Sequence, residues 1–553
     1  MSFLLYNFAR YLYQRYKLLN FYNMAEKNTY LANDLELIDQ EVVLVKKKKS
    51  KLRILIVAAS VLVIGTIVGL IVYLNGQAYK SAILADAPIV LEINVRSLAA
   101  KSELESYKEE VADLVKSIDP EDEELQSITE SITDEKKKTG INFFYPIYAF
   151  TNSDLDEVFV LASVKDKEDL IKTIESVHED IQIFDSSDDI AWIEVNDVVV
   201  GGISDNAVLI GTSDSKSTYK NLLSQKRSNS FFRTDAGKFM KKHTEDVTLM
   251  VDFKNMSGYV YDEIERSFGS VCEIDDLPTV VVNLEFSSGE VALNFFLDGV
   301  DEEVEDIWDN LKLSEDVFEY IPTKNLAGLV ALPLDGPQML DEYDDKIKEI
   351  TNNSTYKVIR KLLNTTEGTA ILSIYNNDPD CDPDILCIIP APKSKIKSII
   401  KDMYGDIPSD MYIDGDDAYT SITTMSDYTF SKSKQAFDGD VKSSFYAVVY
   451  VKEFIKNISN ELKRYVSSDA EKNYNNKLID LLELINNGEV IWEDVDQASI
   501  KLNFTDDSKN ILELLLEHSI QIGEAYLEYL EEREHYVYPG YDPVYYHDDY
   551  YYR

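Results

Sequence analysis

Four aspartates alternate in the run DPDCDPD, and they are the clearest candidate for a metal site in the sequence. They are Asp378, Asp380, Asp382 and Asp384. Alternating carboxylates can ligate calcium, but the EF-hand pattern is not met, because it needs a glycine at the sixth place and a glutamate at the twelfth. Two prolines in the run are typical of an exposed loop between strands. The sequence therefore favours a solvated loop, with calcium binding as the alternative.

Three short strings match motifs of serine β-lactamases and penicillin-binding proteins, which use S-x-x-K, S-D-N and K-T-G. Here they are Ser213–Lys216, Ser204-Asp205-Asn206 and Lys138-Thr139-Gly140, in the reverse order along the chain. Aspartate and asparagine are common in hairpin turns because they tolerate the left-handed conformation. We therefore expect the S-D-N string to be a turn and Ser213 to lie near a strand end, without a catalytic role.

Other catalytic and metal-binding patterns are missing from the sequence. The five histidines do not have the spacing of H-E-x-x-H, and no C-x-x-C, G-x-S-x-G, G-x-G-x-x-G or Walker A string occurs. The three cysteines, Cys272, Cys381 and Cys387, are too few for a disulfide framework. We therefore predict that the protein is not an enzyme and has no cofactor, with a hydrolase whose site is not visible from sequence as the alternative.

The charge of the chain is strongly negative and unevenly distributed. Among 553 residues, 55 are Lys or Arg and 100 are Asp or Glu, which gives a net charge of −45. Residues 1–53 hold ten Lys/Arg and five Asp/Glu, a balance of +5, so the remainder carries −50. Such a body repels nucleic acid phosphates, and we expect no nucleic-acid partner.

An uncharged stretch of 21 residues, Ile54–Leu74, has the length and composition of a transmembrane helix. Lysines 46–49 and 51 and Arg53 precede it, and no Lys or Arg follows until Lys80. Because positive flanks remain in the cytoplasm, we expect a single-pass protein of the cytoplasmic (inner) membrane. Residues 1–53 would then be a short cytoplasmic segment, and the acidic body would be extracytoplasmic (periplasmic).

Residues 1–23 are rich in aromatic and basic side chains and differ from the ordinary polar stretch that begins at Met24. Two interpretations stand. Met24 is the true start and residues 1–23 are a wrongly assigned extension, or these residues form an interfacial helix on the membrane. In both cases the cytoplasmic part is too short to bury a catalytic core.

Four landmarks of the acidic body occur twice in the same order, which is typical of an internal duplication. Alternating apolar and polar residues predict half-buried strands, and the intervening segments supply helices that cover them. We expect an α+β fold: the transmembrane helix, then two similar units of largely antiparallel sheet covered by helices. The units are 80–300 and 320–534, joined by an acidic helix at 301–319. The paired landmarks are strand-to-helix segments at 87–93 and 327–332 and at 158–162 and 385–389, hairpins turning at Ser204-Asp205 and Ser426-Asp427, and closing strand pairs turning at Ser288-Gly289 and Asp507-Ser508.

Three stretches of the first unit, 84–104, 137–150 and 158–174, resemble an uncharacterised family of Bacteroidota envelope proteins described only as a domain of unknown function. The matching places are Gly140, Pro146, Tyr148, Val164, Lys165 and Asp166. The resemblance covers about 80–530 and is best in the first unit. Many relatives are lipoproteins, whereas this chain has no cysteine near the expected membrane segment. The resemblance implies an envelope location and no reaction.

The chain ends in a tyrosine-rich tail, residues 535–553, which prolines and a glycine make unsuitable for a helix. Tyrosine offers large contact area and a hydroxyl group, so the tail is either a frayed end or an adhesive segment. Taken together, the sequence predicts a membrane-anchored, non-enzymatic binding or structural envelope protein. Its expected partners are the membrane, through Ile54–Leu74, and an envelope protein or glycan.

Overall fold

The chain divides into two compact units, Met1–Gly65 and Thr66–Arg553. The computed structural model describes only residues of the second unit. They are 78–118, 139–176, 180–185, 189–260, 277–300, 311–351, 353–377, 383–433, 437, 443–453, 455 and 468–535. The expected cytoplasmic segment, the expected membrane span and most of the tyrosine-rich tail (536–553) lie outside these residues.

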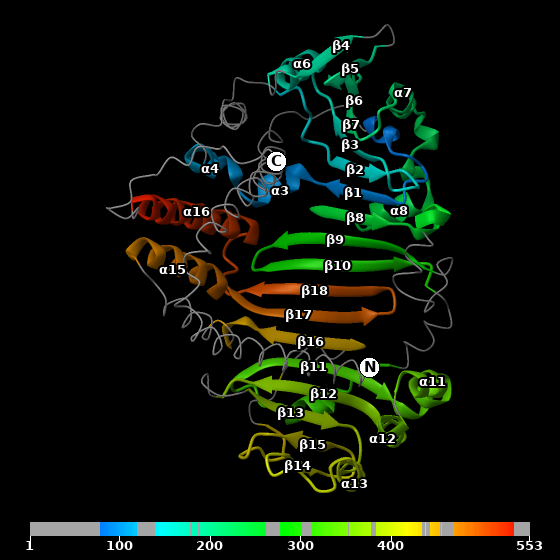
Figure 1. Ribbon diagram of the computed structural model, residues 1–553, viewed down its shortest axis with the longest axis vertical. Helices are drawn as coiled ribbons and strands as arrows, with labels where there is room; N and C mark the ends of the chain where they lie inside the picture. Colours follow the sequence, from blue (N-terminus) through cyan, green and yellow to red (C-terminus); the bar gives the residue numbers. More distant parts are fainter. Residues whose placement is uncertain are drawn as a thin grey trace, which may run out of the picture. The chain divides into compact units, whose positions relative to one another are not determined.

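Eighteen strands form one continuous antiparallel sheet. Their hydrogen-bonded neighbours give the spatial order β4-β5-β6-β7-β3-β2-β1-β8-β9-β10-β18-β17-β16-β11-β12-β13-β15-β14, which can be followed in Figure 1. The strands are β1 Ile89–Ile93, β2 Ile147–Thr151, β3 Val158–Ser163, β4 Ile181–Asp185, β5 Ala191–Val195, β6 Val198–Ile203, β7 Ala207–Gly211, β8 Val247–Val251, β9 Thr279–Ser287, β10 Glu290–Asp298, β11 Leu326–Asp335, β12 Glu367–Tyr375, β13 Asp384–Ile389, β14 Tyr412–Gly415, β15 Thr420–Thr423, β16 Phe445–Tyr450, β17 Ile485–Asp494 and β18 Gln497–Phe504.

Helices connect the strands, and several begin at a side chain that accepts a backbone N–H, which satisfies a donor left free by the first helical turn. These caps are Asn94, Asp166, Ser215, Thr234, Asp335 and Ser468. The helices are η2 Tyr79–Ala82, α3 Val95–Lys101, α4 Leu104–Ile118, α6 Lys167–Glu175, α7 Lys216–Leu223, η3 Arg227–Asn229, η4 Phe231–Arg233, α8 Asp235–Lys242, η5 Phe253–Asn255, η7 Glu315–Tyr320, α11 Gly336–Ile350, α12 Asn353–Leu363, α13 Lys393–Tyr404, α15 Asp469–Glu483 and α16 Ile511–His535, where η marks 3-10 helices.

The predicted fold class is wrong in two respects. The sheet is single, because β10 pairs with β18 along seven residue pairs, so the two expected sheets share their ladder of hydrogen bonds. Among the described residues, no helix is long and apolar enough to cross a membrane. The longest, α16, has 25 residues but carries seven glutamates. The predicted single-pass inner-membrane location and topology are therefore not supported. The predicted span Ile54–Leu74 lies outside the described residues.

The two halves of this one sheet follow the same strand order. Outward from the middle, β10-β9-β8-β1-β2-β3-β7-β6 corresponds to β18-β17-β16-β11-β12-β13-β15-β14. The first half adds β4 and β5 as a further hairpin at its edge. Of the expected connecting helix at 301–319, residues 301–310 lie outside the described part, and Glu315–Tyr320 form η7.

Two of the paired landmarks were assigned to the wrong places in the second half. The strand pair that corresponds to β9 and β10 is β17 and β18, which turns at Val495-Asp496. The segment at Asp507-Ser508 leads into α16 instead of a strand. Likewise, β14 and β15 turn at residues 416–419, whereas Ser426-Asp427 follows β15.

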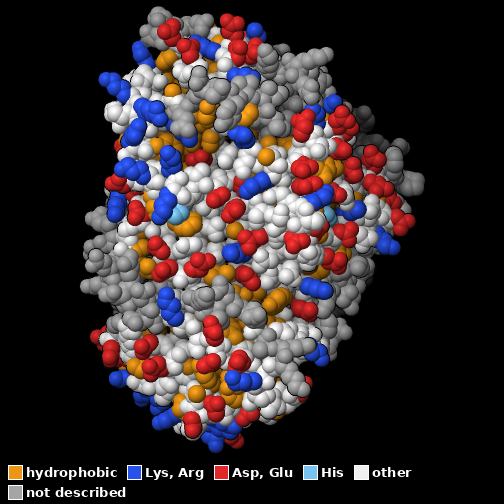
Figure 2. All heavy atoms as spheres, turned by 180° about the vertical axis from the view of Figure 1, so that it is seen from behind, with side chains coloured by type: hydrophobic (Ala, Val, Ile, Leu, Met, Phe, Trp, Pro, Cys, Tyr) orange, Lys and Arg blue, Asp and Glu red, His pale blue; other side chains and the backbone are white. Residues whose placement is uncertain are grey.

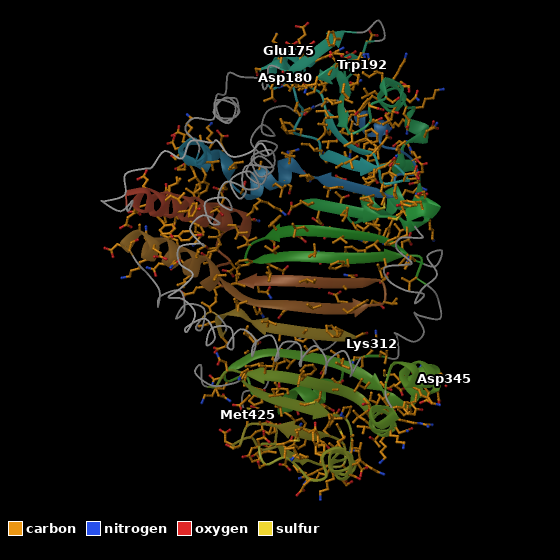
Figure 3. All side chains as sticks on the ribbon, in the orientation of Figure 1. Glu175, Asp180, Trp192, Lys312, Asp345 and Met425 are labelled. Atoms are coloured by element: carbon orange, nitrogen blue, oxygen red, sulfur yellow. The ribbon has the colours of Figure 1, made fainter. Side chains whose placement is uncertain are left out.

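Each half has its own core on the face of the sheet that its connecting segments cover. In the first half, Val90, Tyr148 and Phe159 pack with Tyr79 of η2 and Tyr219 of α7. Side chains alternate across a strand, so these residues share one face. Figure 3 labels Trp192 of the first core and Met425 of the second, which lie toward opposite ends of the sheet.

Candidate anion-binding site

A cavity of about 370 Å³ lies where η2, β1, η3, η4 and α8 meet in the first half. Four of its lining side chains are cationic, one is a carboxylate, three are hydroxyls and one is aromatic. They are Lys80, Arg227, Arg233 and Lys241, then Glu92, then Ser81, Ser230 and Thr244, and Phe232. A cationic cavity is unexpected in a chain whose net charge is −45.

Hydrogen bonds to backbone carbonyls and one close approach between helices hold the walls of this cavity in place. The backbone N–H of Phe231 donates to the carbonyl of Ile83 at 3.4 Å, which ties η4 to the end of η2. The Tyr79 hydroxyl donates to the carbonyl of Pro146 at 2.7 Å, so η2 is also anchored to the start of β2. A Cβ at Gly237 would lie 2.2 Å from the carbonyl oxygen of Phe231, so this glycine lets α8 approach η4 closely.

Lys80 reaches into the cavity over aromatic rings. Its Nζ lies 5.1 Å from the ring centre of Tyr148 and 5.2 Å from that of Phe232, which is cation–π geometry. Burial lowers the pKa of Lys80, and the nearby negative charge of Glu92 opposes this shift. Lys80 is therefore a partly desolvated cation at the inner end of the site.

Glu92 is a buried carboxylate on β1, only 4% exposed. It lies opposite Tyr148 of β2 and Thr248 of β8 in the sheet register. Burial raises the pKa of Glu92, and the charge of Lys80 acts in the opposite direction. The hydroxyl of Tyr148 is buried beside this pair, and its interaction with Glu92 also opposes the rise in the pKa of Glu92. Polar groups are thus held in a desolvated place, which is typical of functional sites.

Among the described residues, the four cations form no close ion pair, although the charge of Lys80 interacts with that of Glu92. None of Lys80, Arg227, Arg233 and Lys241 makes an ion pair or a side-chain hydrogen bond among the described residues. Cationic side chains elsewhere do so, as in the ion pairs of Lys216 with Glu194 and Lys101 with Asp246. Figure 2 shows Lys and Arg side chains gathered at the upper left, the side of α7 and α8 after the half-turn from Figure 1. Unpaired cations around one cavity favour an anionic ligand.

In the second half, the described residues at the corresponding place differ from this arrangement. The buried face of β11, which takes the place of β1, carries the apolar residues Ala327, Leu329 and Ala331. Residues 212–246 separate β7 from β8, whereas the shorter stretch 424–444 separates β15 from β16. The cationic cavity is therefore a feature of the first half.

The aspartates that the sequence singled out lie elsewhere. Asp378, Asp380 and Asp382 are outside the described residues, and Asp384 begins β13. The carboxylate of Asp384 accepts hydrogen bonds from Asn377 Nδ2 at 2.7 Å and Thr424 Oγ1 at 2.8 Å. In the described part of the chain, no three His, Cys, Asp or Glu residues are grouped to hold a metal ion. Calcium binding by this run stays a hypothesis.

The serine and lysine strings do not assemble into a catalytic group. Residues 204–206 form the turn between β6 and β7, where Ser204 Oγ accepts the backbone N–H of Ala207 at 3.1 Å. Ser213 is 3% exposed, and Lys216 Nζ lies 2.7 Å from Glu194 Oε1. Lys138 lies outside the described residues. Turn chemistry and an ion pair account for the residues that are described.

Sequence reasoning missed the cationic cavity, although one signal was present. Residues 225–243 contain six Lys or Arg and a single acidic residue, Asp235, in a chain where acidic residues are nearly twice as common. This stretch supplies Arg227, Arg233 and Lys241. Lys80 and Glu92 carry no such signal, because each stands alone in an apolar segment.

Comparison with family models places this architecture. Residues 79–505 match the model of a domain of unknown function, DUF4836. The chain belongs to this family. The DUF4836 match covers both halves of the sheet and the whole cationic cavity, and it brings no enzyme assignment with it.

No curated protein matches the chain. Among solved structures, crystal forms III and I of TP0453 are similar at 14% and 12% identity. They cover 43% and 40% of this chain and 87% and 78% of their own chains, with TM-scores of 0.25 and 0.24. Likeness at this level carries no argument about function.

Proposed function

We propose that this DUF4836 protein is a non-enzymatic binding protein whose cavity in the first half takes an anionic ligand. The observation that carries the proposal is the set of four cations, Lys80, Arg227, Arg233 and Lys241, that surround one cavity with a single carboxylate, Glu92, among its lining residues. A chain of net charge −45 repels anions at long range, so a local concentration of positive charge favours a specific ligand.

The setting that we propose for this binding is the cell envelope, and the source is Bacteroidota. Both rest on the resemblance of residues 84–104, 137–150 and 158–174 to envelope proteins, many of which are lipoproteins. The partner would be an envelope protein or a glycan that presents the anion. The hydrolase alternative finds no supporting observation among the described residues, since Ser213 is buried and Lys216 is paired with Glu194.

Calorimetry of the full chain with inorganic phosphate at low ionic strength tests the proposal. Arg227→Ala combined with Arg233→Ala should weaken binding about tenfold or more, because each Arg can supply a charge-assisted hydrogen bond. The matched control is Lys238→Ala with Lys242→Ala. It removes the same charge from α8, but neither residue lines the cavity.

Two outcomes would overturn the proposal. One is that the unmodified chain binds neither inorganic phosphate nor any organic phosphate or carboxylate. The other is that both double variants weaken binding equally, which would assign the effect to general electrostatic attraction and not to the cavity.

A further inference from the structure

We infer that the anion is a sugar derivative, with one negative group on a hydroxylated ring, and not a bare inorganic ion. The inference rests on the proposed function and adds the class of ligand. It comes from the part of the cavity that the cations do not line, where the polar groups are acceptors of hydrogen bonds.

The first acceptor is Glu92, whose carboxylate lines the cavity together with the four cations. A bare phosphate or sulfate has only acceptor oxygens and negative charge, so it is repelled by this carboxylate. A ligand with hydroxyl groups can donate to the same carboxylate and form charge-assisted hydrogen bonds. Glu92 therefore disfavours a bare anion and favours one that also carries donors.

The three hydroxyl side chains of the cavity are also acceptors toward a ligand. Ser81 Oγ donates to the carbonyl of Ala78 at 2.7 Å, and Thr244 Oγ1 donates to that of Met240 at 3.2 Å. Ser230 Oγ donates to the carbonyl of Lys80 at 3.5 Å. Each hydroxyl has a single hydrogen, which these carbonyls accept, and two lone pairs that can accept hydrogen bonds from a ligand. This wall therefore suits a ligand that carries donors.

Hydroxyl groups fit this wall better than an ammonium group does. An ammonium could also donate to Glu92, but Lys80 lies beside Glu92 and three further cations line the same cavity, so a positive ligand group is repelled. Neutral hydroxyls donate without that repulsion. The volume of about 370 Å³ is near the lower end of the range for small-ligand pockets, which suits a single sugar unit.

Calorimetry with four probes tests the inference: glucose 6-phosphate, glucuronate, inorganic phosphate and glucose. We expect glucose 6-phosphate to bind about tenfold or more tightly than inorganic phosphate, and glucose to bind weakly, because the site uses both the charge and the donors. Comparing the affinities of glucose 6-phosphate and glucuronate decides whether the cations prefer a phosphate or a carboxylate group. Equal affinity for glucose 6-phosphate and inorganic phosphate would overturn the inference while leaving the proposed function intact.

The variant Glu92→Gln provides a second test of the inference. It keeps the size of the side chain and removes the charge, so affinity for inorganic phosphate should rise about tenfold and the preference for glucose 6-phosphate should shrink. Glu92→Leu, which puts an apolar residue like those on the buried face of β11 at this place, should reduce the preference further, because it removes this acceptor altogether. A melting curve checks that each variant is folded. The double variant Lys80→Met with Glu92→Leu repeats the test without leaving the charge of Lys80 next to an apolar residue. An unchanged preference in the folded variants would contradict the inference, whereas failure of any anion to bind would instead contradict the proposed function.

Discussion

Leu293 of β10 lies directly opposite Ile500 of β18, and each is the fourth residue of its strand. Each strand follows a two-residue turn, Ser288-Gly289 in one case and Val495-Asp496 in the other. A pseudo-two-fold axis therefore passes through this pair of residues. From the pair, the strands run outward in the same order in both directions, so the two halves meet edge to edge as one sheet.

This arrangement removes two edges that would otherwise be exposed. An unpaired edge strand presents free N–H and C=O groups and invites aggregation, and pairing β10 with β18 satisfies those groups within one chain. The halves differ on their buried faces, because that of β1 holds Glu92 and that of β11 holds Leu329. One half keeps an apolar core at the place where the other builds a polar cavity.

The register between the halves predicts a specific cross-link. Ala292 lies opposite Lys501, on the face opposite to that of Ile500. With the native cysteines replaced by serine, Ala292→Cys combined with Lys501→Cys should form a disulfide on mild oxidation, since paired strand residues lie within disulfide reach. Mass spectrometry after digestion measures the product. Ala292→Cys with Ile500→Cys is the control, and if it cross-links equally well, the register is wrong.

A buried carboxylate on the loop before β8 ties three segments together, which predicts a large effect on stability. Asp246 is 1% exposed and accepts hydrogen bonds from Ser97 Oγ at 2.5 Å, Lys101 Nζ at 2.7 Å and the backbone N–H of Phe286 at 2.8 Å. Asp246→Ala should lower the free energy of unfolding by about 3–5 kcal/mol, because it leaves these donors unsatisfied and Lys101 unpaired.

Urea denaturation measures this loss, and an exposed ion pair provides the control. Asp235 pairs with Lys238 on the surface of α8, and its side chain is 94% exposed. Asp235→Ala should therefore change stability little. Comparable losses in the two variants would show that Asp246 does not hold these segments together.

Part of the fold could be predicted from the sequence, because strand-to-helix segments carry strong periodic signals. The stretches that became β1, β3, β11 and β13 were expected as strands because each is an apolar segment that leads into a helix. The β17–β18 hairpin was missed because Val495-Asp496 contains no glycine or asparagine, the usual marks of such a turn. The Asp507-Ser508 segment consists of Asp and Ser, which are also common in turns, yet it leads into α16, where Asn510 accepts the N–H of Leu512.

Neither the pairing of β10 with β18 nor the cavity could be predicted from the sequence, and the physical reason is the same for both. Both depend on residues far apart in the chain, such as Lys80 and Arg233, and local periodicity contains no term for such contacts. The basic stretch at 225–243 could have been noticed, but Glu92, which lines the same cavity, has the sequence context of an ordinary strand residue. Only the fold brings the two together.

A glycine on the segment before β2, which packs against the start of α6, predicts a strong steric effect. Gly140 has a φ of +72°, and a Cβ there would lie 2.2 Å from the backbone nitrogen of Leu170 and 2.4 Å from the carbonyl oxygen of Asp166. Gly140→Ala should destabilise the protein by about 3 kcal/mol or more, through backbone strain and overpacking. Gly258→Ala is the control, since a Cβ at Gly258 meets nothing within 4 Å. If thermal unfolding shows equal shifts, the close packing at Gly140 is not real.

The last prediction concerns the pH dependence of stability, which follows from the burial of Glu92. Its pKa is raised in the folded protein, chiefly by burial, so the folded state binds more protons than the unfolded state above the ordinary value of 4.5. Stability contributed at this position is therefore present below pH 4.5 and is lost as the pH rises through the raised pKa. Burial lowers the pKa of Lys80 from 10.5, so its own contribution rises with pH over a window below that value.

Glu92→Gln removes the first of these contributions and isolates it. The difference in melting temperature, variant minus unmodified protein, should stay constant below about pH 4.5 and increase from there toward neutral pH, because only the unmodified protein must carry a buried charge. Melting curves between pH 3.5 and 7 in a buffer without phosphate, each at ~0.1 M salt, measure it without ligand binding at the cavity. Parallel curves for the two proteins would mean that Glu92 is as well solvated in the folded state as in the unfolded one, and the desolvated acceptor on which the ligand class depends would then be absent.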